Sequence, residues 1–152
     1  MLKYIIDGIK AGIMISVGGS VFLGCENRYV GSVLFCVALL AICLKGYSLF
    51  TGKVGYLPEK HDKEAFEILL LGLLGNVIAT VASGYAVGFA NTALHEAAIT
   101  LCEAKLSQEA LQTFIRAFFC GILMYIAVST YREKKHPRGN FLLRARFYPK
   151  RI

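Results

Sequence analysis

Apolar residues occur in four long stretches that polar connections separate. The stretches cover residues 5–25, 29–50, 68–91 and 114–131. Each comes close to the ~20 mostly apolar residues that a membrane-spanning helix needs. The first is the least uniform, because Asp7 and Lys10 interrupt its beginning. The pattern predicts an all-α membrane protein whose membrane domain, residues 1–137, contains four helices.

The composition agrees with this prediction. Hydrophobic residues make up 56% of the 152 residues, and the mean hydropathy is +0.56, whereas soluble domains are ~45–50% apolar. The first stretch does not match a secretory signal peptide, which has a shorter apolar core and a small-residue cleavage site. We therefore interpret it as a retained membrane helix.

Positive charge is concentrated after the last apolar stretch. The formal net charge is +7, and the tail of residues 138–152 holds five basic residues and no acidic one. Such a tail is typical of contact with nucleic acid or anionic lipid. Beside four membrane helices, we interpret it as a lipid contact or as charge that keeps this end in the cytoplasm. We expect no nucleic-acid partner.

The sign of the charge differs from one connection to the next. The second connection holds Lys53, Lys60 and Lys63, and the fourth stretch is followed by Arg132, Lys134, Lys135 and Arg138. The third connection, residues 92–113, holds three glutamates and Lys105 as its only basic residue. Because lysine and arginine mark the cytoplasmic side, we expect a multi-pass plasma-membrane protein with both termini in the cytoplasm.

The reactive side chains form no recognisable catalytic or metal-binding pattern. The five cysteines include no CxxC pair, and Cys25 and Cys102 lie near the same expected membrane face, which leaves a disulfide between them open. Neither paired acids nor a nucleophile–base spacing occurs near an apolar stretch. We therefore expect no enzyme activity, no catalytic residue, no metal and no cofactor.

A weak internal repeat relates the first and fourth stretches. "AGIMIS" (residues 11–16) is similar to "CGILMY" (residues 120–125). These two helices would cross the membrane in opposite directions, which is typical of the inverted repeats of transporters. On this interpretation the first three stretches form one repeat and the fourth begins the second.

The segment "SLFTG" (residues 48–52) has two interpretations. In one, Thr51 and Gly52 interrupt a membrane helix, because glycine permits a positive φ and transporters break helices at binding sites. In the other, the helix ends at Phe50 and a glycine turn follows. Lys45 is equally open: it either extends to the inner surface or faces a pore, where it would attract anions.

Four ordered segments of the chain resemble the formate/nitrite transporter family. They are "GIKAGIMISVGG", "SLFTGKVGYL", "LLGNVIAT" (which contains Asn76) and "EAKLSQEALQTFIRAFFCGILMYIAV". Each is similar to the corresponding membrane segment of the family, and together they extend over about residues 5–137. No single segment is as specific as a zinc signature, so the order of the set carries the resemblance.

The resemblance implies an aquaporin-like helical bundle built as an inverted repeat of six helices. It implies a homo-pentamer, if the fold is complete, with a pore in each chain. The implied substrates are small monovalent anions such as formate, nitrite or hydrosulfide. This chain would hold the first repeat plus the fourth helix.

The resemblance also assigns a substrate pathway. Thr51 matches the threonine of the loop that breaks the second helix, and Leu49 and Phe50 match the two residues before it. Phe35 and Leu39 correspond to apolar constrictions. They lie four residues apart and so share a helix face, and apolar rings of this kind exclude water and bare ions. Without the resemblance, lipid contact or packing explains both residues.

Lys105 resembles the lysine of the family's outer connection. A lysine there would raise the local anion concentration and favour delivery of protons to the anion. Without the resemblance, Lys105 is a solvated charge.

The chain also departs from the family pattern. Cys120–Gly121 stands where many members have Cys-Asn, and no Gly-Phe-Glu-His segment or sixth helix is present. All three histidines lie outside the apolar stretches. We therefore expect a reading frame that is shifted or shortened after Pro137. The expected function is a small-anion channel or transporter. The alternatives are a nonconducting fragment and a subunit that needs a partner to complete its pore.

Overall fold

The computed structural model describes residues 2–55 and 62–135, with side chains up to Tyr131. Within these residues six helices follow one another: α1 (Leu2–Gly24), α2 (Arg28–Lys45), α3 (Phe50–Lys53), α4 (Lys63–Ala90), α5 (Thr92–Leu106) and α6 (Ala110–Lys135). The basic tail and Lys60 lie outside the described residues.

Four of these helices have the length and apolar character of membrane spans: α1, α2, α4 and α6. The prediction of an all-α membrane bundle is therefore confirmed. The bounds differ for the second span, because α2 ends at Lys45 rather than at residue 50. The third begins earlier than expected, at Lys63, and the fourth begins at Ala110.

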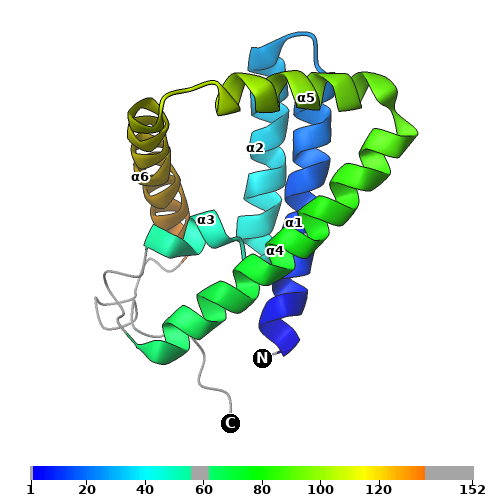
Figure 1. Ribbon diagram of the computed structural model, residues 1–152. Coiled ribbons are helices and arrows are strands. Elements are labelled where there is room, and N and C mark those ends of the chain that lie inside the picture. The colour runs from blue at the N-terminus through cyan, green and yellow to red at the C-terminus, as the bar shows by residue number, and fades with distance from the viewer. Residues whose placement is uncertain (1, 56–61, 136–152) are drawn as a thin grey trace.

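Glycines bring α1 and α4 into close contact, and α4 crosses α1 at an angle (Figure 1). A Cβ atom on Gly8 would lie 2.5 Å from the carbonyl oxygen of Gly72, and one on Gly12 would lie 2.6 Å from the Cβ of Ala79. Membrane helices lack a hydrophobic driving force for association, so small residues that allow close approach stabilise their contacts.

The helices α1 and α2 form an antiparallel hairpin (Figure 1). Asn27 begins α2, and its side-chain oxygen accepts hydrogen bonds from the amides of Tyr29 and Val30, which is the usual role of asparagine at this position. Gly18 of α1 packs against Ala38 and the ring of Phe35. Cys25 and Cys102 are free thiols, so the disulfide that the sequence left open is not formed.

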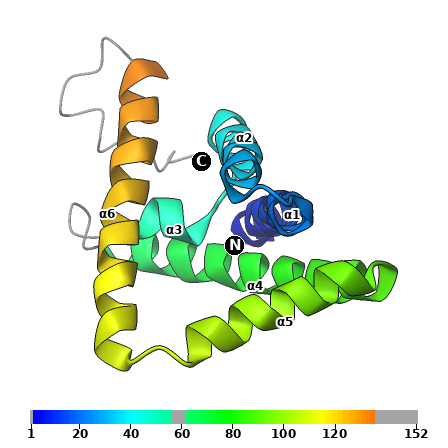
Figure 2. The ribbon, with the colours of Figure 1, turned by 90° about the horizontal axis from the view of Figure 1, so that it is seen from above.

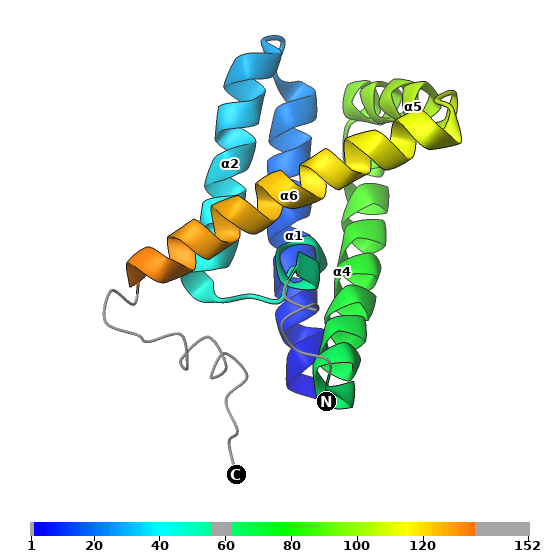
Figure 3. The same ribbon diagram turned by 90° about the vertical axis from the view of Figure 1, so that its left-hand side faces the viewer.

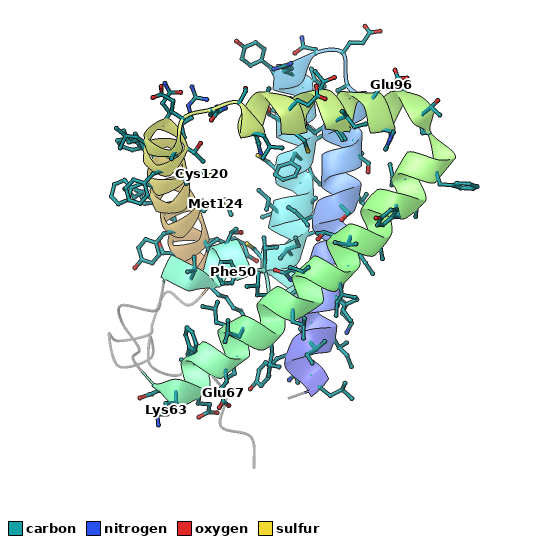
Figure 4. All side chains as sticks on the ribbon, in the orientation of Figure 1. Phe50, Lys63, Glu67, Glu96, Cys120 and Met124 are labelled. Carbon is teal, nitrogen blue, oxygen red and sulfur yellow. The ribbon has the colours of Figure 1, made fainter. Side chains whose placement is uncertain are left out.

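The connection expected at residues 92–113 contains a helix, α5. Asn91 begins it by accepting hydrogen bonds from the amides of Ala93 and Leu94. The helix runs across one end of the bundle, where Glu96 lies on its outer side (Figures 1 and 4). Polar and charged residues interrupt its apolar ones, so it lacks the continuous apolar stretch that would predict a membrane helix.

The last helix, α6, stands apart from the other three spans. Viewed from above, it lies on the far side of α3 from α1 (Figure 2), and it is steeply inclined to α1 and α2 (Figure 3). It contacts the rest of the described structure mainly through α3. A Cβ on Gly52 would lie 3.4 Å from Val128, and Gly55 lies against Tyr125.

Candidate functional site: a broken membrane helix

The helix of the second apolar stretch is interrupted between Lys45 and Phe50, by residues 46–49, which we call the break. Gly46 adopts a left-handed conformation with φ 71°, and residues 47–49 lead into the short helix α3. Among the described residues, Gly46 has the only positive φ. The helix is therefore interrupted earlier than expected, and the expectation that Gly52 permits the interruption is wrong. The alternative that the helix ends at Phe50 is also wrong, because Phe50 begins α3.

The C-terminal end of α2 forms a Schellman motif. The amide of Gly46 donates to the carbonyl of Cys43 at 3.2 Å, and the amide of Tyr47 donates to Ile42 at 3.1 Å. Glycine occupies the left-handed position of this motif because a Cβ there is sterically costly. The local sequence thus explains why α2 ends where it does.

The next three amides of the break bond to other acceptors. Ser48 donates to the carbonyl of Asp7 on α1 at 3.2 Å, Leu49 to the carbonyl of Tyr47 at 3.2 Å, and Phe50 to the side-chain oxygen of Asn76 on α4 at 2.9 Å. A break inside a membrane is tolerated only where its backbone groups find such partners. Every amide from residue 46 to residue 50 has such a partner: the Leu49 amide finds it within the break, and the others find it in α1, α2 or α4.

Asn76 connects three segments of the chain. Its side-chain nitrogen donates to the carbonyl of Gly8 at 2.8 Å and to that of Ser48 at 2.9 Å, and its oxygen accepts from the amide of Phe50. Only 7% of Asn76 is exposed. A buried amide with both donors and its acceptor paired avoids the cost of an unsatisfied polar group.

Ser48 is the most deeply buried residue of the break, with 2% exposure. Its hydroxyl lies over Gly72 of α4, where a Cβ would come within 2.6 Å of the oxygen. Gly72 therefore provides the space into which the break packs. The break is enclosed by α1 and α4 on this side.

A charged pair flanks the break on α1. The Nζ of Lys10 lies 3.9 Å from a carboxylate oxygen of Asp7 and 5.7 Å from the ring centre of Tyr47. The two residues are spaced i, i+3 and so occupy the same side of the helix. The sequence showed them only as an interruption of an apolar stretch, whereas the structure places them beside the break.

The three consecutive pathway residues expected from the sequence lie at the end of the break. Leu49 precedes α3 and is half-buried, as is Phe50, which lies between α4 and α6 (Figure 4). Thr51 follows in the first turn of α3 and is exposed. The threonine is therefore presented by a segment whose backbone α1 and α4 hold in place.

The other expected residues lie away from the break. Phe35 and Leu39 are half-buried on α2, and the ring of Phe35 contacts α1 at Gly18. Lys105 is exposed in the last turn of α5. The structure thus does not bring Lys105 together with Thr51, since α5 and α3 lie at different levels of the bundle (Figure 1). Lys45, left open by the sequence, is the exposed last residue of α2.

Reasoning from the sequence did not assign a role to Asn76. A signal was available, because Asn76 is the one amide side chain within the apolar helix α4. Polar residues inside membrane segments are rare and usually functional. What the sequence could not show was that Gly8, Ser48 and Phe50 converge on this side chain.

One comparison with known proteins identifies a family. The family model described as "Formate/nitrite transporter" matches residues 1–143, which extends beyond Pro137. No curated protein matches the chain, and no solved structure does.

Proposed function

Because the chain belongs to the formate/nitrite transporter family, we propose that it moves small monovalent anions such as formate, nitrite or hydrosulfide across the plasma membrane. The broken second helix carries this proposal. Transporters place such interruptions at their substrate sites, and here the interruption presents an exposed Thr51 within a bundle of membrane helices. Transport across a membrane, rather than an enzymatic reaction, is the activity that this arrangement supports.

The proposed pathway runs along the break. Phe35 and Leu39 on α2 would form an apolar constriction, and Leu49 and Phe50 a second one next to Thr51. Apolar constrictions reject bare ions, so an anion would cross more easily as its neutral acid. Protons are therefore proposed as a second partner.

The distribution of charge supports an orientation in which α5 crosses the outer face of the membrane and anions collect there. Lys105 lies at the end of the bundle that α5 covers, where its charge would concentrate anions. The N-terminal end of α1 and the connection between α3 and α4 would face the cytoplasm, because lysine is concentrated there. The outer face would then be the one that α5 crosses.

Anion uptake by liposomes tests the proposal. We expect purified chain to carry formate or nitrite faster than empty liposomes do, and Thr51→Val to lower the rate by about tenfold, because one hydrogen-bonding group is lost. Thr80→Val is the matched control, since the Thr80 hydroxyl donates only within α4, to the backbone carbonyls of Asn76 and Val77. Lys105→Glu should lower the rate mainly at low salt. Absence of flux at every pH, with folded protein, would contradict the proposal.

The exposure of α6 favours a second candidate, a subunit whose pore a partner completes. Only 6% of the residues in its most apolar stretch are buried, so one side of the proposed pathway has little cover from the described residues. A homo-pentamer or a separate helical partner would supply that cover, and lipid would cover the remaining apolar surface. Flux that appears only in a cross-linkable oligomer would support this candidate over an independent chain.

A further inference from the structure

We infer that Asn76 is a positioning residue that sets the place of Thr51 in the pathway. The inference rests on the proposed function, because it names the side chain that holds the proposed site. It concerns the three hydrogen bonds by which one amide joins α1, the break and α3.

The bonding pattern fixes the orientation of the Asn76 amide. Its nitrogen faces two carbonyl oxygens, those of Gly8 and Ser48, and its oxygen faces the N–H of Phe50. Turning the amide over would bring its N–H groups against the N–H of Phe50 and its oxygen against two carbonyls. Because only one orientation is acceptable, the side chain acts as a rigid connection between the three segments.

Asn76 is the side-chain anchor of the break, and the other anchor is backbone. The amide of Ser48 bonds to the carbonyl of Asp7, a contact between two main-chain groups. The amide of Phe50 depends on the side chain of Asn76. Phe50 and Thr51 are neighbours in the chain, so any displacement of the Phe50 amide also moves Thr51.

Three substitutions test the donors and the acceptor of Asn76. Asn76→Asp keeps an oxygen for the Phe50 amide but places carboxylate oxygens against the carbonyls of Gly8 and Ser48. Asn76→Leu removes all three bonds and keeps the branch at Cγ, but its side chain is larger. Asn76→Ser is a smaller polar variant that cannot overpack the site. Thr80→Val, one turn further along α4, is the control.

The first readout is selectivity in liposomes. We expect the ratio of formate flux to acetate flux to change by about threefold to tenfold in Asn76→Leu, the range that one lost hydrogen bond gives. A purely structural role would lower both fluxes together by lowering the amount of folded protein, and would leave their ratio unchanged. Thr80→Val should keep the ratio of the unmodified chain.

The second readout does not depend on transport. In a Thr51→Cys chain, a water-soluble maleimide labels the introduced thiol, and mass spectrometry compares its labelling rate with that of the native, exposed Cys102 on α5. We expect each Asn76 variant to change the ratio of the two labelling rates by about threefold or more. This ratio remains measurable even if the unmodified chain carries no anion, so failure of the proposed function and failure of this inference are distinguishable.

Two outcomes would overturn the inference. One is a folded Asn76 variant with unchanged flux and labelling ratios. The other is failure of all three variants to fold when Thr80→Val folds, since Asn76 would then stabilise the bundle rather than position the break.

Discussion

The helices α4 and α6 are similar in length and differ in how they are packed. Each has a stretch apolar enough to cross a membrane, yet 39% of that stretch is buried in α4 and 6% in α6. Residues facing α1 from α4 are small or polar: Gly72, Gly75, Asn76 and Ala79. Those exposed along α6 are large: Phe114, Phe118, Phe119 and Leu123.

The difference shows what determines contact between helices in a membrane. Lipid tails solvate large apolar side chains as well as other helices do, so apolarity alone gives no preference for a protein partner. Close backbone approach and interhelical hydrogen bonds do favour a protein partner over lipid. In α4 both occur at the same level, where Gly75 meets α1 and Asn76 meets the break.

The largest effect is expected from a methyl group between α1 and α4. A Cβ on Gly75 would collide with the backbone of Ile5 and Ile9, so Gly75→Ala should lower the free energy of unfolding by about 1–3 kcal/mol. Thermal unfolding in detergent measures the change.

Gly121→Ala on α6 is the matched control. Nothing lies within 4 Å of the position that its Cβ would occupy, so we expect no destabilisation and a gain of up to about 1 kcal/mol, because alanine is the better helix former. Equal destabilisation by the two substitutions would mean that α6 is packed as tightly as α4, and the comparison would fail.

A smaller effect is expected at the end of α2, where the break that packs on α1 and α4 begins. Gly46→Ala should destabilise the protein by about 1–2 kcal/mol, because a left-handed residue with a Cβ is strained. No atom lies within 4 Å of that Cβ position, so the cost is conformational. Gly46→Asn should recover part of it, since asparagine tolerates this conformation. Equal melting temperatures for the alanine and asparagine variants would contradict this explanation.

The sequence predicted the spans well and the break only in part. Runs of apolar residues sufficed for α1, α2, α4 and α6, because membrane helices need length and apolarity. The break was placed too late, at Gly52, since both Gly46 and Gly52 permit a positive φ. In the structure, Gly46 takes the positive φ because its amide and that of Tyr47 bond to carbonyls in the last turn of α2. The sequence alone does not show which glycine makes these bonds.

The candidate site was predicted through resemblance rather than through physical pattern. Thr51 has no periodicity or spacing that marks it, and its exposure at the end of the break is a property of the fold. The ion pair of Asp7 and Lys10 was visible as two charges, but its contact with Tyr47 joins residues that are distant along the chain. Pairing of this kind requires the arrangement of helices in space.

A further test concerns the contact that holds α6. Val128 is 7% exposed and packs on Gly52 of α3. We expect Val128→Ala to cost on the order of 1 kcal/mol, mainly through lost packing, because lipid offers little transfer penalty. Leu123→Ala, at a residue 68% exposed, should be neutral. Detergent melting curves compare the two, and a larger loss for Leu123→Ala would show that the exposed face of α6 has a partner.

The smallest effect is expected at the charged pair beside the break. Lys10→Met keeps the length of the side chain but removes both the ion pair with Asp7 and the contact with the Tyr47 ring. Because half of the Lys10 side chain is exposed, the expected loss is about 0.2–1 kcal/mol, and added salt should reduce it. Lys45→Met, at an exposed lysine in the last turn of α2, is the control for loss of a charge and should cost only the roughly 0.3 kcal/mol that an exposed cation gives at a helix C-terminus. A loss at Lys10 that salt does not alter would assign its contribution to packing on Tyr47 rather than to charge. The break would then be held on the α1 side by shape and backbone bonds, whereas on the α4 side the side chain of Asn76 holds it.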